Sequence, residues 1–93
     1  MRARLLLHER RILSTEAFVE MVVWQIPEPV RGSRHELKYR LAFVVNGVCV
    51  LRYDNEAGKG DHKHLGGEES SYTFTTPAQL LADFWNDVDR WRS

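Results

Sequence analysis

The chain has 93 residues, of which 43% are hydrophobic and 28% charged, and its 13 Lys and Arg balance its 13 Asp and Glu. A chain this short cannot bury two independent cores, so we expect residues 1–93 to form a single domain. The zero net charge excludes a uniformly basic protein that coats nucleic acid, because such binding needs a surplus of Lys and Arg. A local basic site is still compatible with that balance.

Secretion, membrane insertion and disulfide bonding have no signature in this sequence. The only cysteine, Cys49, excludes an internal disulfide and a cysteine-based zinc site. It lies among valines, so we expect a buried and unreactive thiol. The apolar run near the start is Leu5–Leu7, whereas a secretion signal needs about 7–15 apolar residues and a membrane helix about 20. We therefore expect a cytoplasmic protein with no membrane partner.

The first third of the chain predicts two strands followed by a loop. Residues 17–26 are rich in β-branched and aromatic side chains and stop before Pro27, which cannot donate a ladder hydrogen bond. Residues 4–13 are expected to form the partner strand. Residues 27–34 contain proline, glycine and serine, which favours a loop.

An Asn46-Gly47 pair between two β-rich runs predicts a hairpin with a two-residue type I′ turn. The resulting register pairs Val45 with Val48, Phe43 with Val50, Leu41 with Arg52 and Arg40 with Tyr53. Because side chains alternate along a strand, one face of the hairpin is expected on the core. That face comprises Tyr39, Leu41, Phe43, Val45, Val48 and Val50, and the opposite face comprises Lys38, Arg40, Ala42, Val44, Cys49, Leu51 and Tyr53.

The end of the chain predicts a helix. Thr76 is a suitable N-cap, Pro77 suits the first helical position, and Gln79 is expected to complete a capping box. The sequence therefore predicts an α+β fold: an antiparallel β-sheet of about four to five strands, arranged as a meander and covered by one C-terminal α-helix. An apolar stripe at helical spacing comprises Leu80, Leu81, Phe84, Trp85, Val88 and Trp91, and Asp83, Asn86, Asp87, Asp89 and Arg90 are expected to face away from it.

Residues 53–67, with the sequence YDNEAGKGDHKHLGG, hold residue types that suit chemistry on a phosphate. Glycines let the backbone approach an anion, imidazoles transfer protons near neutral pH, and Lys and Arg bind phosphate. If residues 61–65 are extended, His62 and His64 project to one side and Lys63 to the other. Three interpretations stay open: a solvated glycine-rich loop, a phosphate or RNA site, and a metal site. The metal ligands would be Asp61, His62 and His64, although Asp61 and His62 point to opposite sides of a regular strand.

Four segments together resemble the TumE family, the toxin component of bacterial type II toxin–antitoxin pairs. The similarity runs from about Arg11 to Val88 and is most specific in the motif YDNxxGKGDHKH. It implies a toxin that pairs with a helix-turn-helix antitoxin, but it assigns no catalytic residues. The four segments are residues 39–43 (YRLAF), 50–55 (VLRYDN), 58–64 (GKGDHKH) and 80–85 (LLADFW).

Small toxins of such pairs often cut RNA, so we expect a metal-independent endoribonuclease that needs no cofactor. One of His62 and His64 would take the proton of the 2′-hydroxyl, and the other would protonate the leaving 5′-oxygen. Arg40 and Lys59 would stabilise the charge on the phosphorane, and Tyr53 would stack on a base or donate a hydrogen bond. The remaining candidates are Lys38, Gly58, Gly60 and Lys63 for binding RNA phosphate, and Asp54 and Asp61 for orienting a histidine.

Two other functions stay open at this point. The first is a metal-dependent nuclease or hydrolase that uses Asp61, His62 and His64, and the second is a toxin that inhibits its target by binding alone. The expected partners are the cognate antitoxin and RNA, with or without the ribosome. A homodimer is also compatible with the sequence.

Overall fold

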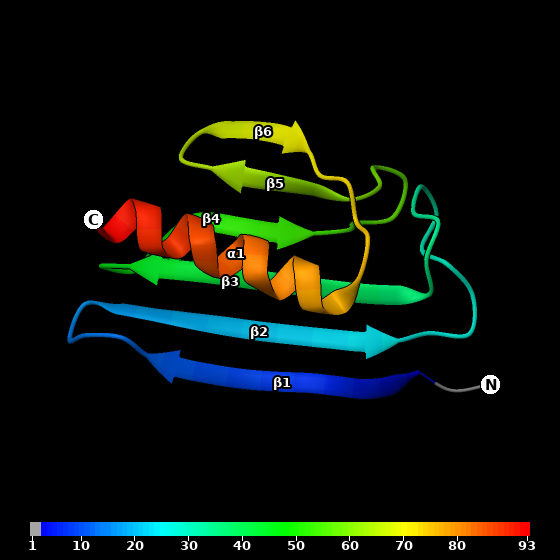
Figure 1. Ribbon diagram of the computed structural model, residues 1–93, viewed down its shortest axis with the longest axis horizontal. Helices are drawn as coiled ribbons and strands as arrows, with labels where there is room; N and C mark the ends of the chain where they lie inside the picture. The colour runs from blue at the N-terminus through cyan, green and yellow to red at the C-terminus, as the bar shows by residue number, and fades with distance from the viewer. Residues whose placement is uncertain (1–2) are drawn as a thin grey trace.

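The computed structural model describes residues 3–93 and shows a six-stranded antiparallel sheet with one helix across one face (Figure 1). Each strand pairs with its neighbour in the chain, so the sheet is a simple meander. The α+β class, the meander and the C-terminal helix are confirmed, but there are six strands rather than four to five. The elements are β1 (Arg4–Ile12), β2 (Ala17–Gln25), β3 (Leu37–Val45), β4 (Val48–Asp54), β5 (His62–Leu65), β6 (Glu68–Ser71) and α1 (Pro77–Arg92).

The additional strand has no hydrophobic pattern that could reveal it. All four residues of β6 (EESS) are exposed, and the strand is held by pairing with β5 across the Gly66-Gly67 turn. Strand assignment from sequence depends on alternating apolar residues, which β6 lacks. None of the helices in residues 3–93 is long and apolar enough to cross a membrane.

The core lies between α1 and the face of the sheet that the helix covers. It is built from alternate residues of three central strands and from one stripe of the helix, so both elements bury their apolar side only. We call the other side of the sheet, which no element of residues 3–93 covers, the open face. The fully or almost fully buried core residues include Val19, Met21, Leu41, Phe43, Leu51, Tyr53, Leu80, Phe84 and Val88.

A β-bulge at Val50 changes the predicted register of the Asn46-Gly47 hairpin. The turn itself is confirmed, since Asn46 and Gly47 both have positive φ, as a type I′ turn requires. Beyond it, Val44 pairs with Cys49 but Phe43 pairs with Leu51, so Val50 is an extra residue on β4. All β4 residues after Val50 therefore lie on the face opposite to the predicted one.

Because of this bulge, the predicted faces of three residues in β4 are wrong: Leu51, Arg52 and Tyr53. Tyr53 pairs with Leu41 and lies in the core instead of beside Arg40, and Leu51 is buried rather than on the opposite face. Asp54 takes the place opposite Arg40, and Arg52 pairs with Ala42 on the open face. The prediction for Cys49 is also wrong, because Cys49 is exposed: it lies beside Val44 on the face that no element covers.

The helix begins as predicted but uses its first turn differently. The Thr76 side chain accepts a hydrogen bond from the Gln79 backbone N–H, whereas the Gln79 side chain donates to Asp83 and so does not complete a capping box. Asp83 and Asp87 do not face away from the sheet as expected. The carboxylate of Asp87 accepts a hydrogen bond from the hydroxyl of Tyr53 in β4, and that of Asp83 accepts one from Tyr72, which directly follows β6.

Docking of the helix depends on Phe84, which is completely buried and packs edge-on against the ring of Tyr53. We expect Phe84→Ala to lower the free energy of unfolding by about 3–5 kcal/mol, because it removes apolar contacts and leaves a cavity. Urea denaturation followed by circular dichroism measures this loss. The exposed Asn86 of the same helix provides the control, and Asn86→Ala should change stability by no more than about 0.5 kcal/mol. Equal stability of the two variants would contradict this account of the core.

Candidate functional site

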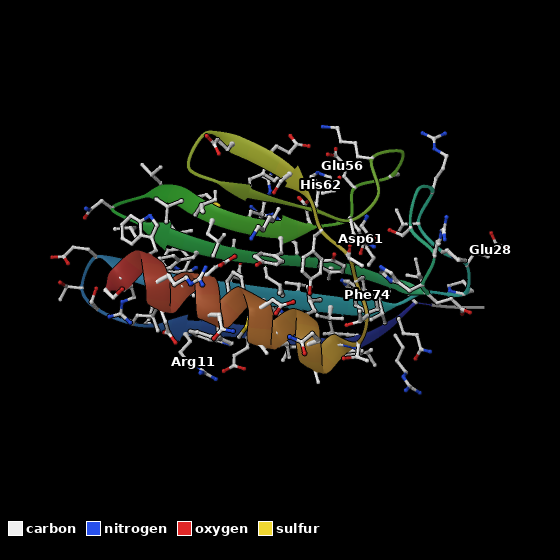
Figure 2. All side chains as sticks on the ribbon, turned by 45° about the horizontal axis from the view of Figure 1, so that its top comes forward. Arg11, Glu28, Glu56, Asp61, His62 and Phe74 are labelled. Atoms are coloured by element: carbon white, nitrogen blue, oxygen red, sulfur yellow. The ribbon has the colours of Figure 1, made fainter. Side chains whose placement is uncertain are left out.

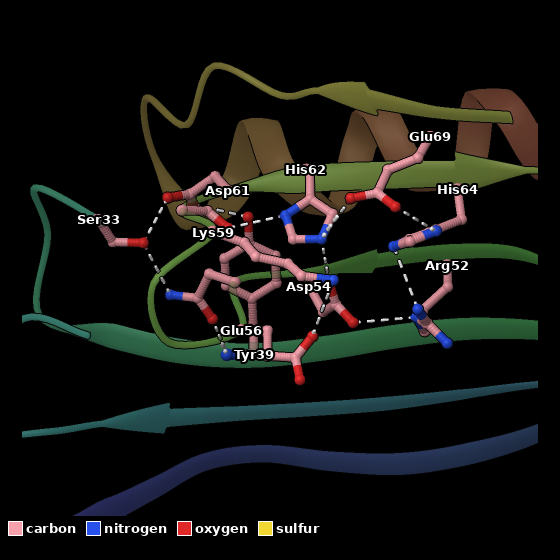
Figure 3. A network of polar contacts seen from close by, with 12 residues as sticks. Ser33, Tyr39, Arg52, Asp54, Glu56, Lys59, Asp61, His62, His64 and Glu69 are labelled. Atoms are coloured by element: carbon pink, nitrogen blue, oxygen red, sulfur yellow. Dashed lines mark hydrogen bonds and ion pairs between the residues drawn. The ribbon is translucent and has the colours of Figure 1, made fainter. Parts of the chain in front are cut away.

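Two neighbouring rows of paired residues cross the open face and gather most of its charged side chains. Paired residues on adjacent strands project to the same face, so each row forms a line of neighbouring side chains. Five residues at the β4–β6 end of these rows, Arg52, Asp54, His62, His64 and Glu69, form what we call the open-face cluster (Figure 3). The first row is His8, Val22, Arg40, Asp54, His62 and Ser71, and the second is Arg10, Glu20, Ala42, Arg52, His64 and Glu69.

His62 is the buried member of the cluster. Its side chain is 5% exposed, and its Nδ1 lies 2.8 Å from the carbonyl oxygen of Gly60. A carbonyl oxygen only accepts, so Nδ1 carries the proton and donates it. Nε2 lies 3.4 Å from Oδ1 of Asp54 and 3.3 Å from Oε1 of Glu69, but makes no hydrogen bond with either. The imidazole is thus held by one nitrogen, while the other faces two carboxylates.

His64 is the more accessible histidine, with its side chain 25% exposed. Its Nε2 lies 3.1 Å from Nη2 of Arg52, and because a guanidinium only donates, Nε2 accepts this hydrogen bond. Its Nδ1 then carries the proton and lies 3.6 Å from Oε2 of Glu69. Glu69 therefore approaches both histidines, one with each carboxylate oxygen.

Asp54 joins the two rows. Its Oδ2 lies 2.9 Å from Nε of Arg52, whereas its Oδ1 is buried and has no hydrogen-bond partner. The structure therefore brings the carboxylate of Asp54, and not that of Asp61, to the imidazole of His62. Burying a polar atom without a partner costs stability, and such atoms are rare in native proteins. The cluster keeps three of them: Nε of Arg52, Oδ1 of Asp54 and Nε2 of His62.

Positive charge continues from the cluster across β3. Arg40 is exposed on the open face and pairs with Asp54. Lys38 is exposed on the same face, two residues nearer the beginning of β3, and pairs with Trp24. Trp24 is 36% exposed, so an aromatic surface lies beside this lysine.

The glycine-rich loop is used mainly to join two loops at one end of the sheet. The Gly58 N–H donates to the carbonyl of Arg31 at 2.6 Å, and the Lys59 N–H donates to Glu56. These two amides are therefore already engaged within the protein. Gly60 has φ +74°, and a Cβ there would lie 2.8 Å from the carbonyl oxygen of Gly32. The Lys59 side chain is 57% exposed and lies 3.8 Å from a carboxylate oxygen of Glu56.

Asp61 belongs to a different site, beside the segment that leads to α1 and near Phe74 (Figure 2). Its carboxylate accepts hydrogen bonds from Ser33 at 2.6 Å, from Tyr39 at 2.7 Å and from Nε2 of His35 at 2.6 Å. Burial raises the pKa of the Tyr39 hydroxyl above its ordinary value, and the hydrogen bond to Asp61 raises it further. The set Asp61, His62 and His64 is thus not brought together. Asp54, His62 and His64 are, with one donor atom of each within 4.8 Å of the others.

Tyr53 and Lys63 lie on the covered face. Their pairing in the sheet confirms that Lys63 projects opposite to His62 and His64. Lys63 donates to the carboxylate of Asp87 at 3.1 Å, and the Tyr53 hydroxyl donates to the same carboxylate. Tyr53 is 1% exposed, and burial followed by this hydrogen bond raises its pKa above the ordinary value. It is therefore a neutral core residue whose ring is not available for stacking on a base.

Arg52 and Glu69 are members of the cluster that sequence reasoning missed. The sequence contains a pattern that could have revealed Arg52, because Arg52 and Asp54 alternate along one strand as His62 and His64 do along the next. Placing Arg52 beside the histidines also required knowing the bulge at Val50, since the predicted register put Arg52 on the core face. Glu69 could not be assigned at all without recognising β6 as a strand.

Comparison with known families gives one match. The family model described as Toxin TumE matches residues 2–92, which is nearly the whole chain. Searches of curated proteins and of solved structures find no match.

The close approach of Gly60 to Gly32 gives a test of what the loop glycine does. We expect Gly60→Ala to destabilise the protein more than Gly66→Ala, because both glycines have positive φ but a Cβ at Gly66 meets nothing within 4 Å. The backbone strain shared by the two variants is about 1–2 kcal/mol, and the contact with Gly32 adds to it in Gly60→Ala alone. Urea denaturation of both variants measures the difference. Equal losses would show that the loop contact contributes nothing.

Proposed function

The chain belongs to the TumE family, the toxins of toxin–antitoxin systems, and from this premise we propose that it inhibits growth by cleaving RNA at the open-face cluster. The observation that carries the proposal is the grouping of two imidazoles, a guanidinium and two carboxylates on a sheet face that no element of residues 3–93 covers. Cleavage of a phosphodiester needs proton transfer and positive charge near the phosphorus, and these are the residue types that supply both.

The basic residues around the cluster support an RNA strand as the substrate. Arg40 and Lys38 extend positive charge along β3 from the cluster toward the loop end of the sheet. At that end, the separate pocket beside Asp61, of about 400 Å³, is also lined by two basic residues, Arg34 and Lys59. Phosphate contacts of this kind position a strand without reading its sequence. The exposed ring of Trp24 beside Lys38 offers a surface on which an unpaired base can stack.

The proposed reaction is an internal displacement at phosphorus. The ribose 2′-oxygen attacks the phosphorus, and the bond from phosphorus to the 5′-oxygen breaks. The 2′-hydroxyl proton passes to a base and a proton passes to the leaving 5′-oxygen, so the products are a 2′,3′-cyclic phosphate and a 5′-hydroxyl. His62 and His64 supply these proton transfers either directly or through an ion that they hold, while Arg52 and Arg40 stabilise the charge on the phosphorane.

The two histidines differ in how well they suit direct transfer. His64 is 25% exposed and has a solvent-side ring within reach of a bound strand. His62 is 5% exposed, and its free nitrogen faces two carboxylates instead of solvent. This burial makes His62 better suited to binding an ion than to transferring a proton directly to or from RNA.

A toxin of this family implies an antitoxin, and we propose a helix-turn-helix protein that silences the toxin by covering the open face and the loop beside it. Covering is the simplest form of inhibition, because it needs no conformational change in the toxin. The exposed basic side chains Lys38, Arg40 and Lys59 favour an acidic surface on the partner, since complementary charge speeds and directs association.

Removal of the accessible imidazole tests the proposed function. We expect His64→Ala to lower the rate of RNA cleavage by about 10²–10⁴-fold, the usual loss for one proton-transfer group, and to relieve growth inhibition. Expression in growing cells and mapping of transcript ends measure the two effects. The matched control is His8→Ala, since His8 is an exposed histidine on the same face but at the far edge of the sheet. A folded His64→Ala variant as toxic as the wild type would refute the assignment.

Lysine labelling tests the proposed antitoxin surface. We expect the antitoxin to lower several-fold the rate at which an amine-reactive reagent modifies Lys59 and Lys38, because the antitoxin would cover the open face and the adjacent loop where these two lysines lie. Lys63 is the internal control, since it lies on the helix side of the sheet in an ion pair with Asp87. Mass spectrometry of free toxin and complex gives the three rates. Unchanged labelling of Lys59 and Lys38 would exclude this mode of inhibition.

A further inference from the structure

The unpartnered atoms at the centre of the open-face cluster are arranged like the donor atoms of a metal site. We propose that Asp54, His62 and His64 form a binding site for a divalent transition-metal ion of the Zn²⁺ class. One donor atom from each of the three lies within 4.8 Å of the others. The site differs from the metal site considered from sequence, because Asp54 on β4 replaces Asp61.

The protonation state of His62 supports a metal ligand. Its Nδ1–H donates to the carbonyl of Gly60, which leaves the lone pair of Nε2 for another partner. Histidines that bind metals commonly donate their other N–H to a backbone carbonyl in this way, because the contact fixes the tautomer and the ring orientation. The free Nε2 is buried, has no hydrogen bond and points at the carboxylate of Asp54.

Asp54 presents a matching oxygen. Arg52 holds Oδ2, so Oδ1 is the free oxygen, and it is buried without a hydrogen bond. Its distance from Nε2 of His62 is 3.4 Å. Two ligands bound tetrahedrally at about 2.0–2.1 Å from a zinc ion are about 3.3–3.4 Å apart. The pair is therefore already spaced as two ligands of one ion.

His64 completes the set when the ring nitrogen that meets the ion gives up its present contact, either with Arg52 or with Glu69. Glu69 lies beside it. Three protein ligands leave one position of a tetrahedral ion open, which is the pattern of catalytic rather than structural zinc sites. Glu69 approaches both histidines and is 48% exposed, so it can contact whatever occupies the open position. Arg52, which touches both Asp54 and His64, orients the carboxylate.

The charge of the cluster favours a cation. With neutral histidines, the two carboxylates of Asp54 and Glu69 outweigh the single charge of Arg52. A proton on Nε2 of His62 is the competing way to satisfy these groups, but the geometry at Asp54 does not form the hydrogen bond that such a proton would make. Two imidazoles and one carboxylate suit zinc and related ions better than Mg²⁺, which prefers oxygen ligands.

The role of the ion rests on the proposed function, whereas its binding does not. In RNA cleavage, an ion held by Asp54, His62 and His64 would supply Lewis-acid chemistry toward a phosphate oxygen of the bound strand. His62 would then act as a ligand and not as a proton donor, which agrees with its burial and with the direction of its free nitrogen.

Cobalt titration tests the site on the full chain. The purified protein is first treated with a chelator and dialysed, and Co²⁺ is then added while visible absorption reports its coordination. We expect the spectrum of a low-coordinate Co²⁺ ion bound by one protein site, with displacement by Zn²⁺. His62→Gln and Asp54→Asn should each weaken binding by at least about tenfold, because losing a ligand costs more than losing an outer partner. The matched controls are His8→Gln and Asp89→Asn, exposed residues outside the cluster that should bind as the wild type does.

The outcomes separate the ion from the function. Absence of Co²⁺ binding, or binding that survives both His62→Gln and Asp54→Asn, would overturn the metal site. Should the His62 variant fail to fold, as judged by circular dichroism, the isosteric Asp54→Asn decides alone. Metal binding without RNA cleavage would overturn the proposed function and leave the site standing. Cleavage that persists at full rate in the chelated protein would overturn the role of the ion in the reaction, while the Co²⁺ titration alone decides whether the site binds metal.

Discussion

The extra residue at Val50 is the constraint on which the rest of the molecule depends. A β-strand alternates its side chains with a period of two, so a single inserted residue exchanges the two faces for everything that follows it. In β4 this exchange sends Leu51 and Tyr53 into the core and sends Arg52 and Asp54 to the open face. Without the bulge, two charged groups would lie under the helix and an aromatic ring would lie in solvent.

The same alternation continues through β5 and gives the two faces different tasks. Lys63 and Tyr53 meet Asp87 of the helix, and these contacts hold α1 against the sheet. His62 and His64, on either side of Lys63, point the other way into the open-face cluster. In the short strand β5, Lys63 therefore stabilises the docking of the helix, while its two neighbours, His62 and His64, contribute to the candidate site.

The buried polar side chains of this protein differ in whether their hydrogen-bonding atoms all have partners. The carboxylate of Asp61 accepts three hydrogen bonds and is fully satisfied, so it stabilises the loop end of the sheet as a structural element. Asp54 and His62 are buried to a similar degree but leave one atom each without a partner. Because an unsatisfied buried atom costs stability, its persistence at Asp54 and His62 favours a site that is completed by a ligand.

The sequence by itself determined the local features: the Asn46-Gly47 turn, the strands of the first half, the N-cap at Thr76 and the opposite projection of Lys63 and the two histidines. Each follows from the dihedral preferences of a few residues or from strand alternation, which act over short distances. Only the tertiary structure decided the bulge, the polar strand β6 and the partners of the histidines. These depend on which distant residues pair, as when Asp54 and not the adjacent Asp61 meets His62, because pairing across the sheet outweighs nearness in the chain.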